Sequence, residues 1–474
     1  MKPNLPNWQE RYHARHIVTM HVRIQDRPGS LAAVLDAIGD AGGALGNIEI
    51  VGADSTHKIR NVQVFAVDLR CLNAIIEAVR ALPAAELLKV TDDVLEIHRG
   101  GAIETRSRVV LDSLAKLRMV YTPGVASVCK LIEADPEQAW EYTHKCHRIA
   151  IETKGTAILG LGDIGPLAGL PVMEGKAAIL AQFVGVSADP VLIDSHDSAE
   201  IIDIVTKIAS QYGAIQLEDI AAPACFEIEE ALDATLPVPV FHDDQHGTAT
   251  VVLAGLLSAM KRTGREFKDL NVAMLGAGAA GIAIARLLLD LGVGDLVMCD
   301  SRGALHPGRD DLNPWKRIIA ERGNRENITG DFSEVIRGRN LFIGVAKPNT
   351  VTKAQIASMA DDAVVFALAN PVSEIAVEDA VDAGAAIAVD GRSMNNALAY
   401  PGIFRGALDA RARRITTEMK LAAARTLAEC ATETLMPDML DMTVHRRVTR
   451  AVREAWEQHG EGAAAGTPEL ARAH

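Results

Sequence analysis

Two pairs of adjacent acidic residues are the first candidates for chemistry in this sequence. Glu218-Asp219 follows the apolar stretch AIQL, and Asp243-Asp244 follows VPVFH about 25 residues later. Both pairs are therefore expected at strand ends, where parallel sheets place functional groups. Neighbouring carboxylates repel one another, so two such pairs brought together need a cation, and oxygen ligands favour Mg²⁺ or Mn²⁺ over zinc. Acidic dipeptides are also common on solvated surfaces, so this pattern alone leaves both interpretations open.

Two groups of histidines suggest zinc but lack the pattern of a zinc site. His242 and His246 are four apart, but the intervening DDQ is not the E-x-x of a zinc protease, and nearby prolines break the required helix. The other group lies in AWEYTHKCHRIAIE, which has the pattern of an amphipathic helix with ordinary packing and surface residues. It consists of His144, Cys146 and His147.

A glycine-rich sequence, LGAGAAG, has the full context of a dinucleotide-binding turn. The strand NVAML precedes it, and the helix IAIARLLLDLG follows. This arrangement provides a tight turn, close backbone approach to a pyrophosphate and a helix N-terminus facing the phosphates. The expected cofactor-binding residues are Gly276, Gly278, Ala279, Ala280 and Gly281.

The next strand, LVMCD, ends on Asp300, which is placed to accept hydrogen bonds from the ribose hydroxyls of the adenosine. A carboxylate there favours NAD because it repels the 2′-phosphate of NADP, although Ser301 and Arg302 leave NADP open. An earlier glycine sequence, LGLGDIG, places Asp163 where phosphate would approach, and PLAGLP follows it instead of a helix. We interpret its glycines as serving a tight crossing of backbones.

A series of further motifs occurs in a fixed order. It runs VYTPGVA, LGLGDIGP, MEGKA, LEDI, FHDDQHGTA, LGAGAAG, ALANP and NNALAYPGIFRGALD. The series resembles the malic enzymes of the shorter prokaryotic type over about residues 99–440. The resemblance implies oxidative decarboxylation of L-malate to pyruvate, with NAD or NADP and a divalent metal, Mg²⁺ or Mn²⁺.

The resemblance also assigns roles to single residues. The implied metal ligands are Glu218, Asp219 and Asp244. The implied acid-base pair is Tyr121 and Lys176, with Asp243 as their neighbour. The implied substrate contacts are Asn370, which also lies at the cofactor, and Asn396 with Asn395 beside it.

The implied chemistry needs these residue types. Lys176, with a pKa expected to be lowered by burial and a nearby metal, removes the proton of the C2 hydroxyl while hydride leaves C2. The metal then acts as a Lewis acid during loss of CO₂, and Tyr121 protonates C3. One position departs from larger relatives, because Ala157 stands just before the expected Ile158-Leu159-Gly160 strand where those proteins carry an arginine for a substrate carboxylate.

Two other functions are compatible with parts of this pattern. Malolactic decarboxylation would convert malate to lactate with bound NAD reduced and reoxidised in place. A nucleotide-sensing regulatory protein would bind the cofactor without turnover. Formation of pyruvate with stoichiometric cofactor reduction distinguishes the first function from both.

The elements that position these residues fall into an α/β arrangement of several domains. Residues 14–98 predict a ferredoxin-like βαββαβ unit, with an alternating strand from Val18 to Ile24 and a last strand at 93–98. Its segment QDRPGSLAAVLDAIGDAGG resembles the opening of ACT domains. The resemblance implies a small effector near Asp26, Arg27, Gly29 and Asn47; a dimerisation module without ligand is the alternative.

Residues 99–245 predict an α/β substrate and metal domain, and residues 246–440 a Rossmann-like, doubly wound NAD(P) domain. Candidate parallel strands of the latter begin near residues 271, 296, 341, 364 and 386. Residues 441–474 predict a C-terminal helix and a frayed tail.

Bulk composition limits the partners of this chain. It has 474 residues, 49% of them hydrophobic, and a net charge of −14, which disfavours nucleic acid and anionic membrane surfaces. The long uncharged stretch at residues 248–260 is too short to span a membrane. Six scattered cysteines without a C-x-x-C pair are typical of a cytoplasmic protein. A homo-oligomer, a dimer or a dimer-based assembly, is expected from the resemblance.

Overall fold

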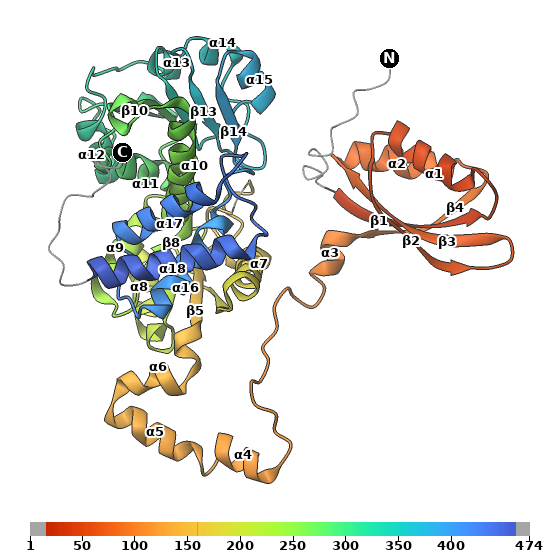
Figure 1. Cartoon of the computed structure of the whole chain (residues 1–474), viewed down its shortest axis with the longest axis horizontal. Helices are drawn as coiled ribbons and strands as arrows, with labels where there is room; N and C mark the ends of the chain where they lie inside the picture. The colour runs from red at the N-terminus through yellow and green to blue at the C-terminus, as the bar shows by residue number, and fades with distance from the viewer. Residues whose placement is uncertain (1–15, 159, 461–474) are drawn as a thin grey trace. The chain divides into compact units, whose positions relative to one another are not determined.

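The computed structural model describes residues 16–158 and 160–460. The chain divides into two compact units, Met1–Glu104 and Thr105–His474 (Figure 1). The tail expected to fray, 461–474, lies outside the described residues. The finer domain boundaries at 98, 245 and 440 stay predictions.

The first unit is a four-stranded antiparallel sheet with two helices on one face (Figure 1). Its strand order is β2-β3-β1-β4. Alternate residues of β1 from Val18 to Ile24 are buried, as the sequence pattern predicts for a strand with one face on the core. The elements are β1 (His16–Gln25), α1 (Ser30–Asp40), β2 (Ala44–Ala53), β3 (His57–Ala66), α2 (Leu69–Arg80), β4 (Ala85–Asp92) and α3 (Asp93–Ile97).

The strand predicted at 93–98 is wrong, because this segment forms the short helix α3. The Asp92 carboxylate accepts hydrogen bonds from the backbone N–H groups of Val94 and Leu95 and so caps a helix. The fourth strand lies just before it, where β4 pairs with β1.

The second unit begins with short helices and then a parallel four-stranded sheet, in the order β6-β5-β7-β8. Helices connect successive strands, so the carboxyl ends of all four strands lie at one edge. The elements are α4 (Leu114–Val120), α5 (Val125–Ala134), η2 (Pro136–Gln138), α6 (Ala139–Tyr142), η3 (His144–His147), β5 (Arg148–Thr153), α7 (Pro166–Val184), β6 (Ser187–Leu192), α8 (Ser198–Ile208), η4 (Ala209–Gln211), β7 (Ala214–Leu217), α9 (Ala224–Thr235) and β8 (Val240–His242).

Three local predictions in this region are wrong. The segment AWEYTHKCHRIAIE contains one turn of helix, η3 and the buried strand β5 rather than one amphipathic helix. A long helix, α7, does follow LGLGDIG, because proline is well tolerated in the first turn and Pro166 begins the helix. Ile158 forms a single bridge to Gly162 instead of starting a strand, and residue 159 lies outside the described residues.

A six-stranded sheet follows, in the order β11-β10-β9-β12-β13-β14. All of its pairs are parallel except that of β10 with β11, so the predicted doubly wound sheet is present. The elements are η5 (Asp243–Gly247), α10 (Thr248–Thr263), η6 (Phe267–Asp269), β9 (Asn271–Leu275), α11 (Ala279–Asp290), β10 (Asp295–Asp300), β11 (Gly303–Ala304), α12 (Pro314–Arg322), α13 (Phe332–Ile336), β12 (Leu341–Gly344), α14 (Lys353–Ala357), β13 (Val364–Ala367), α15 (Val377–Asp382) and β14 (Ile387–Asp390).

The chain then contributes η7 (Asn396–Leu398) and three helices, α16 (Tyr400–Asp409), α17 (Thr417–Cys430) and α18 (Met442–His459), which pack together. Helix α16 also packs on α7, and α17 packs on α10. Within the described residues, α7 is the one helix long and apolar enough to cross a membrane by length and composition, but Met173 and Leu180 pack in the core.

Candidate active site

The two acidic pairs meet at the carboxyl edge of the β5–β8 sheet. Glu218 and Asp219 directly follow β7, and Asp243 and Asp244 directly follow the adjacent strand β8, as the sequence predicts. One carboxylate oxygen from each of Glu218, Asp219 and Asp244 lies within 4.8 Å of the others. We call these three residues the carboxylate triad.

The backbone around Asp219 is shaped to bring the triad together. Asp219 has a left-handed φ of 53°, which is uncommon for a residue other than glycine. Its N–H donates to the Asp244 carboxylate at 2.9 Å, and its carbonyl accepts from the N–H groups of Thr156 and Ala157. The loop after β5 thus supports the turn that carries a triad member.

Lys176 projects from α7 into the same group. Its Nζ lies 2.9 Å from Glu218 Oε1 and 2.5 Å from Asp243 Oδ2, and only 13% of its side chain is exposed. The ring of Tyr400 lies 4.8 Å from the same ammonium group. Asn396 Nδ2 donates to Asp243 at 2.8 Å, so Asp243 is held between the lysine and the amide.

The lowered pKa expected for Lys176 depends on burial and a nearby metal together, and in this arrangement burial alone does not produce it. Burial by itself lowers the pKa of Lys176, but the negative charges of Asp243 and Glu218 outweigh burial and raise the pKa well above its usual value. Burial, together with the repulsion between neighbouring acids, raises the pKa of Glu218 to about 7 and that of Asp219 to about 8. Excess negative charge therefore dominates the group.

The donor set fits a hard divalent cation. Asp219 Oδ2 and Asp243 Oδ1 are buried and have no hydrogen-bond partner among the described residues. Burying such atoms without compensation is costly, and a cation bound by oxygen ligands supplies the compensation. The neighbouring Ala157 contributes no positive charge, whereas larger relatives are expected to carry an arginine at this position.

Close packing fixes Asp243 on the single π-helical turn η5, which leads from β8 into α10. A Cβ added to Gly247 would lie 1.8 Å from Asp243 Oδ1, so only glycine leaves room for the carboxylate. Turns of this kind occur frequently at functional sites.

Three residues assigned by the resemblance are not joined to the triad by a contact between described residues. Tyr121 ends α4 and is 69% exposed. Asn395 uses its side-chain oxygen to cap η7, directly before Asn396. Asn370 follows β13, at the carboxyl edge of the six-stranded sheet, before the cis peptide bond to Pro371.

The LGAGAAG turn has the geometry of a pyrophosphate-binding loop. Gly276 has a φ of 111°, and a Cβ there would lie 2.4 Å from the Val345 carbonyl oxygen. A Cβ on Gly281 would lie 2.0 Å from the carbonyl oxygen of Gly276, so α11 packs directly on the turn. Gly278 faces open space at the N-terminus of α11, which begins with Ala279 and Ala280. This cradle fits the phosphates of a dinucleotide.

The earlier glycine sequence, LGLGDIG, passes close to the backbone at Gly155, but Gly162 and Gly165 would have open space for a Cβ, so the predicted crossing depends on Gly155 rather than on those two glycines. Its three glycines, Gly160, Gly162 and Gly165, all have positive φ. A Cβ on the preceding Gly155 would lie 2.3 Å from the Gly165 carbonyl oxygen, and one on Gly160 would lie 3.0 Å from Pro371.

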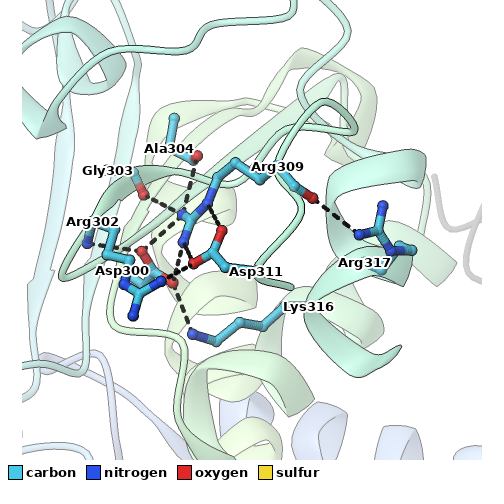
Figure 2. A network of polar contacts seen from close by, with 8 residues as sticks. All are labelled: Asp300, Arg302, Gly303, Ala304, Arg309, Asp311, Lys316 and Arg317. Atoms are coloured by element: carbon cyan, nitrogen blue, oxygen red, sulfur yellow. Dashed lines mark hydrogen bonds and ion pairs between the residues drawn. The ribbon is translucent and has the colours of Figure 1, made fainter. Parts of the chain in front are cut away.

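Asp300 is tied into a network that the sequence analysis missed (Figure 2). Its two oxygens accept from both terminal nitrogens of Arg309, at 2.8 and 3.1 Å, from Lys316 at 2.8 Å and from the N–H of Arg302 at 2.9 Å. Asp311 binds the other edge of Arg309. Burial opposes ionisation of Asp300, but the bonds from Arg309 and Lys316 lower its pKa overall. The several basic residues in 302–317 were the feature of the sequence that could have indicated cationic partners for Asp300.

Glu374 is a second residue that the sequence analysis missed. Its buried carboxylate accepts from the N–H of Ala346 at 2.7 Å and from the N–H of Ala369 at 3.0 Å. It therefore connects the loops that follow β12 and β13 and supports Asn370. No spacing rule in the sequence predicts such a contact between loops.

The second unit combines a Rossmann-type sheet that bears this glycine turn with an α/β sheet whose strand ends carry the triad, and helix α7 adds Lys176. This combination defines a nucleotide-dependent oxidoreductase. Family models agree: residues 101–200 match the malic enzyme N-terminal domain, and residues 245–392 and 351–445 match the malic enzyme NAD-binding domain. The chain therefore belongs to the malic enzyme family.

Individual relatives support this assignment. The chain is 43% identical over 449 residues to the NAD-dependent malic enzyme of Geobacillus stearothermophilus, covering 92% of this chain and 94% of the relative. That share exceeds what Thr105–His474 alone could provide, so the similarity extends into the first unit. It is also 43% identical to the bifunctional malic/malolactic enzyme of Bacillus subtilis, covering 79% of this chain and 94% of that protein. The structure of the NAD-dependent malic enzyme from Thermotoga maritima matches with a TM-score of 0.74 and 41% identity, over 77% of this chain and 99% of that chain.

Proposed function

We propose that this enzyme oxidises L-malate at C2 and releases CO₂, forming pyruvate and reduced NAD(P). The observation that carries the proposal is Lys176 held between Asp243 and Glu218 beside the carboxylate triad. A base and a set of cation ligands lie within reach of one small substrate there. The names of the relatives at 43% identity support the same reaction.

Glu218, Asp219 and Asp244 would hold the divalent metal, Mg²⁺ or Mn²⁺. When bound, the metal polarises the C2 oxygen and stabilises the negative charge left as CO₂ departs. A cation held there would share the carboxylate charge and so reduce the attraction that raises the pKa of Lys176. Lys176 can then give up its proton and serve as a base.

Lys176 in its neutral form accepts the proton of the C2 hydroxyl. Asp243 and Asn396 keep its Nζ directed into the group, because Asp243 is itself fixed by the amide. The LGAGAAG turn would hold NAD(P), to which the hydride of C2 would pass. We assign Asn370, Asn395 and Asn396 to the substrate side, near the carboxyl edges of the two sheets.

Tyr121 supplies a proton to C3 of the enol product, and we propose that a homo-oligomer, most simply a dimer, brings it to the triad. Helices α4 and α5 contain no buried residue. Large apolar side chains exposed along this apolar arm, residues 109–131, are Val109, Val110, Leu111, Leu114, Leu117, Met119, Val120, Tyr121 and Leu131. Large apolar side chains exposed in such number favour burial against a second copy of the chain.

A steady-state assay tests the reaction. Malate with Mn²⁺ or Mg²⁺ and NAD or NADP should give pyruvate and reduced cofactor in equal amounts, and exhaustive chelation should abolish the rate. Full activity after chelation would contradict the metal-dependent mechanism.

Malolactic decarboxylation is the second candidate, because the Bacillus subtilis relative is named as bifunctional. Product analysis separates the two reactions. Lactate without net cofactor reduction would favour the malolactic reaction, whereas pyruvate with stoichiometric reduction favours oxidative decarboxylation.

For the cofactor we propose NAD, with NADP as the alternative. Asp300 lies at the end of β10, where ribose hydroxyls approach, and Arg309 and Lys316 hold its carboxylate in one orientation. The cations around it, Arg302 among them, would offset the charge of a 2′-phosphate. The ratio of kcat/KM for NAD and NADP tests the preference.

For the first unit we propose a ferredoxin-like ACT domain that binds a small effector. Its element order and its β2-β3-β1-β4 sheet support this assignment. Asp26, Arg27 and Gly29 form the turn before α1, with Asp26 paired to Lys58 at 2.8 Å, and Asn47 lies in an irregular step of β2. Thermal-shift screening of amino acids and central metabolites is the test; no shift, and unchanged kinetics after removal of residues 1–98, would favour a purely structural unit.

We propose a cytoplasmic location without a nucleic-acid or membrane partner. The six cysteines are all free, and the net charge is −14. Free thiols persist in reducing compartments. Fractionation of cells that express the protein tests the location.

A further inference from the structure

A buried carboxylate on the far side of the metal-ligand turn has no part in the mechanism above. Glu229 lies on α9 and is 8% exposed. Its Oε1 accepts from the N–H of His242 at 2.7 Å, and its Oε2 accepts from Gln245 Nε2 at 2.8 Å. These two donors stand on either side of Asp243 and Asp244 in the sequence. Glu229 therefore accepts hydrogen bonds from the turn on both sides of the acidic pair.

A third contact, through His246, connects Glu229 to another helix. His246 Nε2 lies 3.1 Å from Glu229 Oε2, and its Nδ1 lies 3.3 Å from Nζ of Lys420 on α17. Because a lysine ammonium can only donate, Nδ1 of His246 accepts and Nε2 carries the hydrogen that reaches Glu229. The chain Lys420–His246–Glu229 thus connects α17 to α9 through the turn.

The turn that Glu229 holds, η5, needs contacts from other elements to stay in its π-helical form. Residues Asp243–Gly247 form the π-helical turn η5 at the start of α10. Isolated π turns are rare because the α-helical alternative is usually more stable. A return to α-helical winding would rotate Asp243 and Asp244 away from Lys176 and from Glu218 and Asp219.

We propose that Glu229 is a positioning residue for the metal site, since its carboxylate holds the π turn that directs Asp244 toward Glu218 and Asp219. This inference rests on the proposed role of the triad as metal ligands. Residues behind metal ligands fix ligand orientation, and their substitution commonly weakens metal binding by about 10- to 100-fold. Glu229 itself is not a member of the triad.

The experiment measures Mn²⁺ binding to the full-length protein by titration calorimetry. Glu229→Gln keeps the shape of the side chain but replaces one acceptor oxygen with a donor that faces other donors. We expect the Kd for Mn²⁺ to rise about 10- to 100-fold, while the Kd for NAD stays within about twofold of the wild type. The matched control is Glu227→Gln, which removes a charge from an exposed position of the same helix and should bind Mn²⁺ as the wild type does.

A double-mutant cycle separates positioning from a general loss of stability. If Glu229 acts through Asp244, Glu229→Gln should weaken Mn²⁺ binding strongly in the wild type and only slightly in Asp244→Asn. Equal effects in both backgrounds would overturn the inference. So would an unchanged Kd for Mn²⁺ in Glu229→Gln.

Two further outcomes keep the test decisive. If Glu229→Gln does not fold, Gln245→Ala removes one contact to the same carboxylate and should raise the Kd for Mn²⁺ by about tenfold; unchanged binding would overturn the inference. If the wild-type protein binds no Mn²⁺, the proposed metal site is itself wrong. Failure of the metal site is thus distinguishable from failure of the positioning role.

Discussion

Individual side chains in this enzyme act mainly through charge. Lys176 lies between Glu218 and Asp243, and Glu218 also belongs to the one group of candidate metal ligands among the described residues, the carboxylate triad. The acidic pairs could be predicted from the sequence because strand-like stretches precede them. The role of Lys176 could be inferred only from the motif series, since a lysine after Glu174-Gly175 looks like an ordinary surface residue.

Removing the Lys176 amine should affect the chemical step. We expect Lys176→Ala to lower kcat by about 10²- to 10⁴-fold, as for other acid-base groups. The variant should still bind Mn²⁺, because Glu218, Asp219 and Asp244 are unchanged. Steady-state kinetics and calorimetry provide the two measurements, and wild-type turnover in the variant would refute the assigned base.

Asp300 shows a residue whose surroundings could not be predicted. Its position at a strand end follows from the sequence, but its partners Arg309 and Lys316 lie in a loop and a helix whose paths no local pattern determines. Asp300→Ala would leave both cations without their shared anion. We expect the ratio of kcat/KM for NADP to that for NAD to rise about tenfold, since about 1.4 kcal/mol of altered charge interaction suffices. A fall in this ratio would contradict the assigned role.

Glu152 predicts a pH dependence of stability. Burial raises its pKa from 4.5 to about 8, and neither oxygen has a hydrogen-bond partner among the described residues. Because the folded protein holds this proton more tightly than the unfolded chain, the contribution to stability is complete below pH 4.5 and is lost as the pH rises toward 8.

Comparison with Glu152→Gln isolates this effect from other titrating groups. Between about pH 5 and about pH 8, the free energy of unfolding of the wild type should fall relative to that of Glu152→Gln by up to the order of 5 kcal/mol. Urea unfolding at both pH values measures it. A difference that does not change with pH would show that Glu152 is not protonated in the folded protein.

Among the structural elements, parallel strands were predicted best. All five candidate strands of the six-stranded sheet occur, because runs of buried aliphatic residues bounded by helices are a strong signal. Short elements were predicted less well: α3 was expected as a strand, and the start of α7 was missed at Pro166. A capping aspartate starts α3, and a proline in the first turn starts α7. Each start depends on one residue, which a pattern over several residues does not detect.

The π turn η5 makes Gly247 indispensable. Gly247→Ala would place a methyl group 1.8 Å from Asp243 Oδ1. We expect loss of Mn²⁺ binding and a fall in activity of at least about 100-fold, as for a misplaced catalytic group. Gly39→Ala, in the helix α1, is the control, because a Cβ there meets nothing within 4 Å and its activity should match the wild type. Normal activity in Gly247→Ala would show that Asp243 need not occupy this position.

At the scale of the whole molecule, the chain consists of two compact units and an apolar arm within the second. The division could be anticipated from the sequence, because residues 14–98 already form a complete pattern of strands and helices. The exposure of the arm could not be anticipated, since VYTPGVA has the pattern of an ordinary turn and helix. The exposure of a helix depends on which other elements pack on it, and no local motif determines that.

Mixing inactive subunits tests whether Tyr121 acts across an interface. Tyr121→Phe and Lys176→Ala should each be inactive alone. After exchange of subunits, mixed dimers should recover up to about a quarter of wild-type activity, as expected when half of the dimers are mixed and each contains one intact site. Recovery measured against unmixed controls supports a shared site, and no recovery with proven exchange would place Tyr121 at the triad of its own chain.

The exposed arm also has a consequence for how the enzyme behaves on dilution. If Tyr121 reaches the triad only in the assembled protein, a separated subunit lacks its acid and cannot complete a turnover. Specific activity should then decline as the protein concentration falls below the Kd of assembly, and should return with a lag on reconcentration. The reaction rate would therefore rise more than proportionally with the concentration of the enzyme.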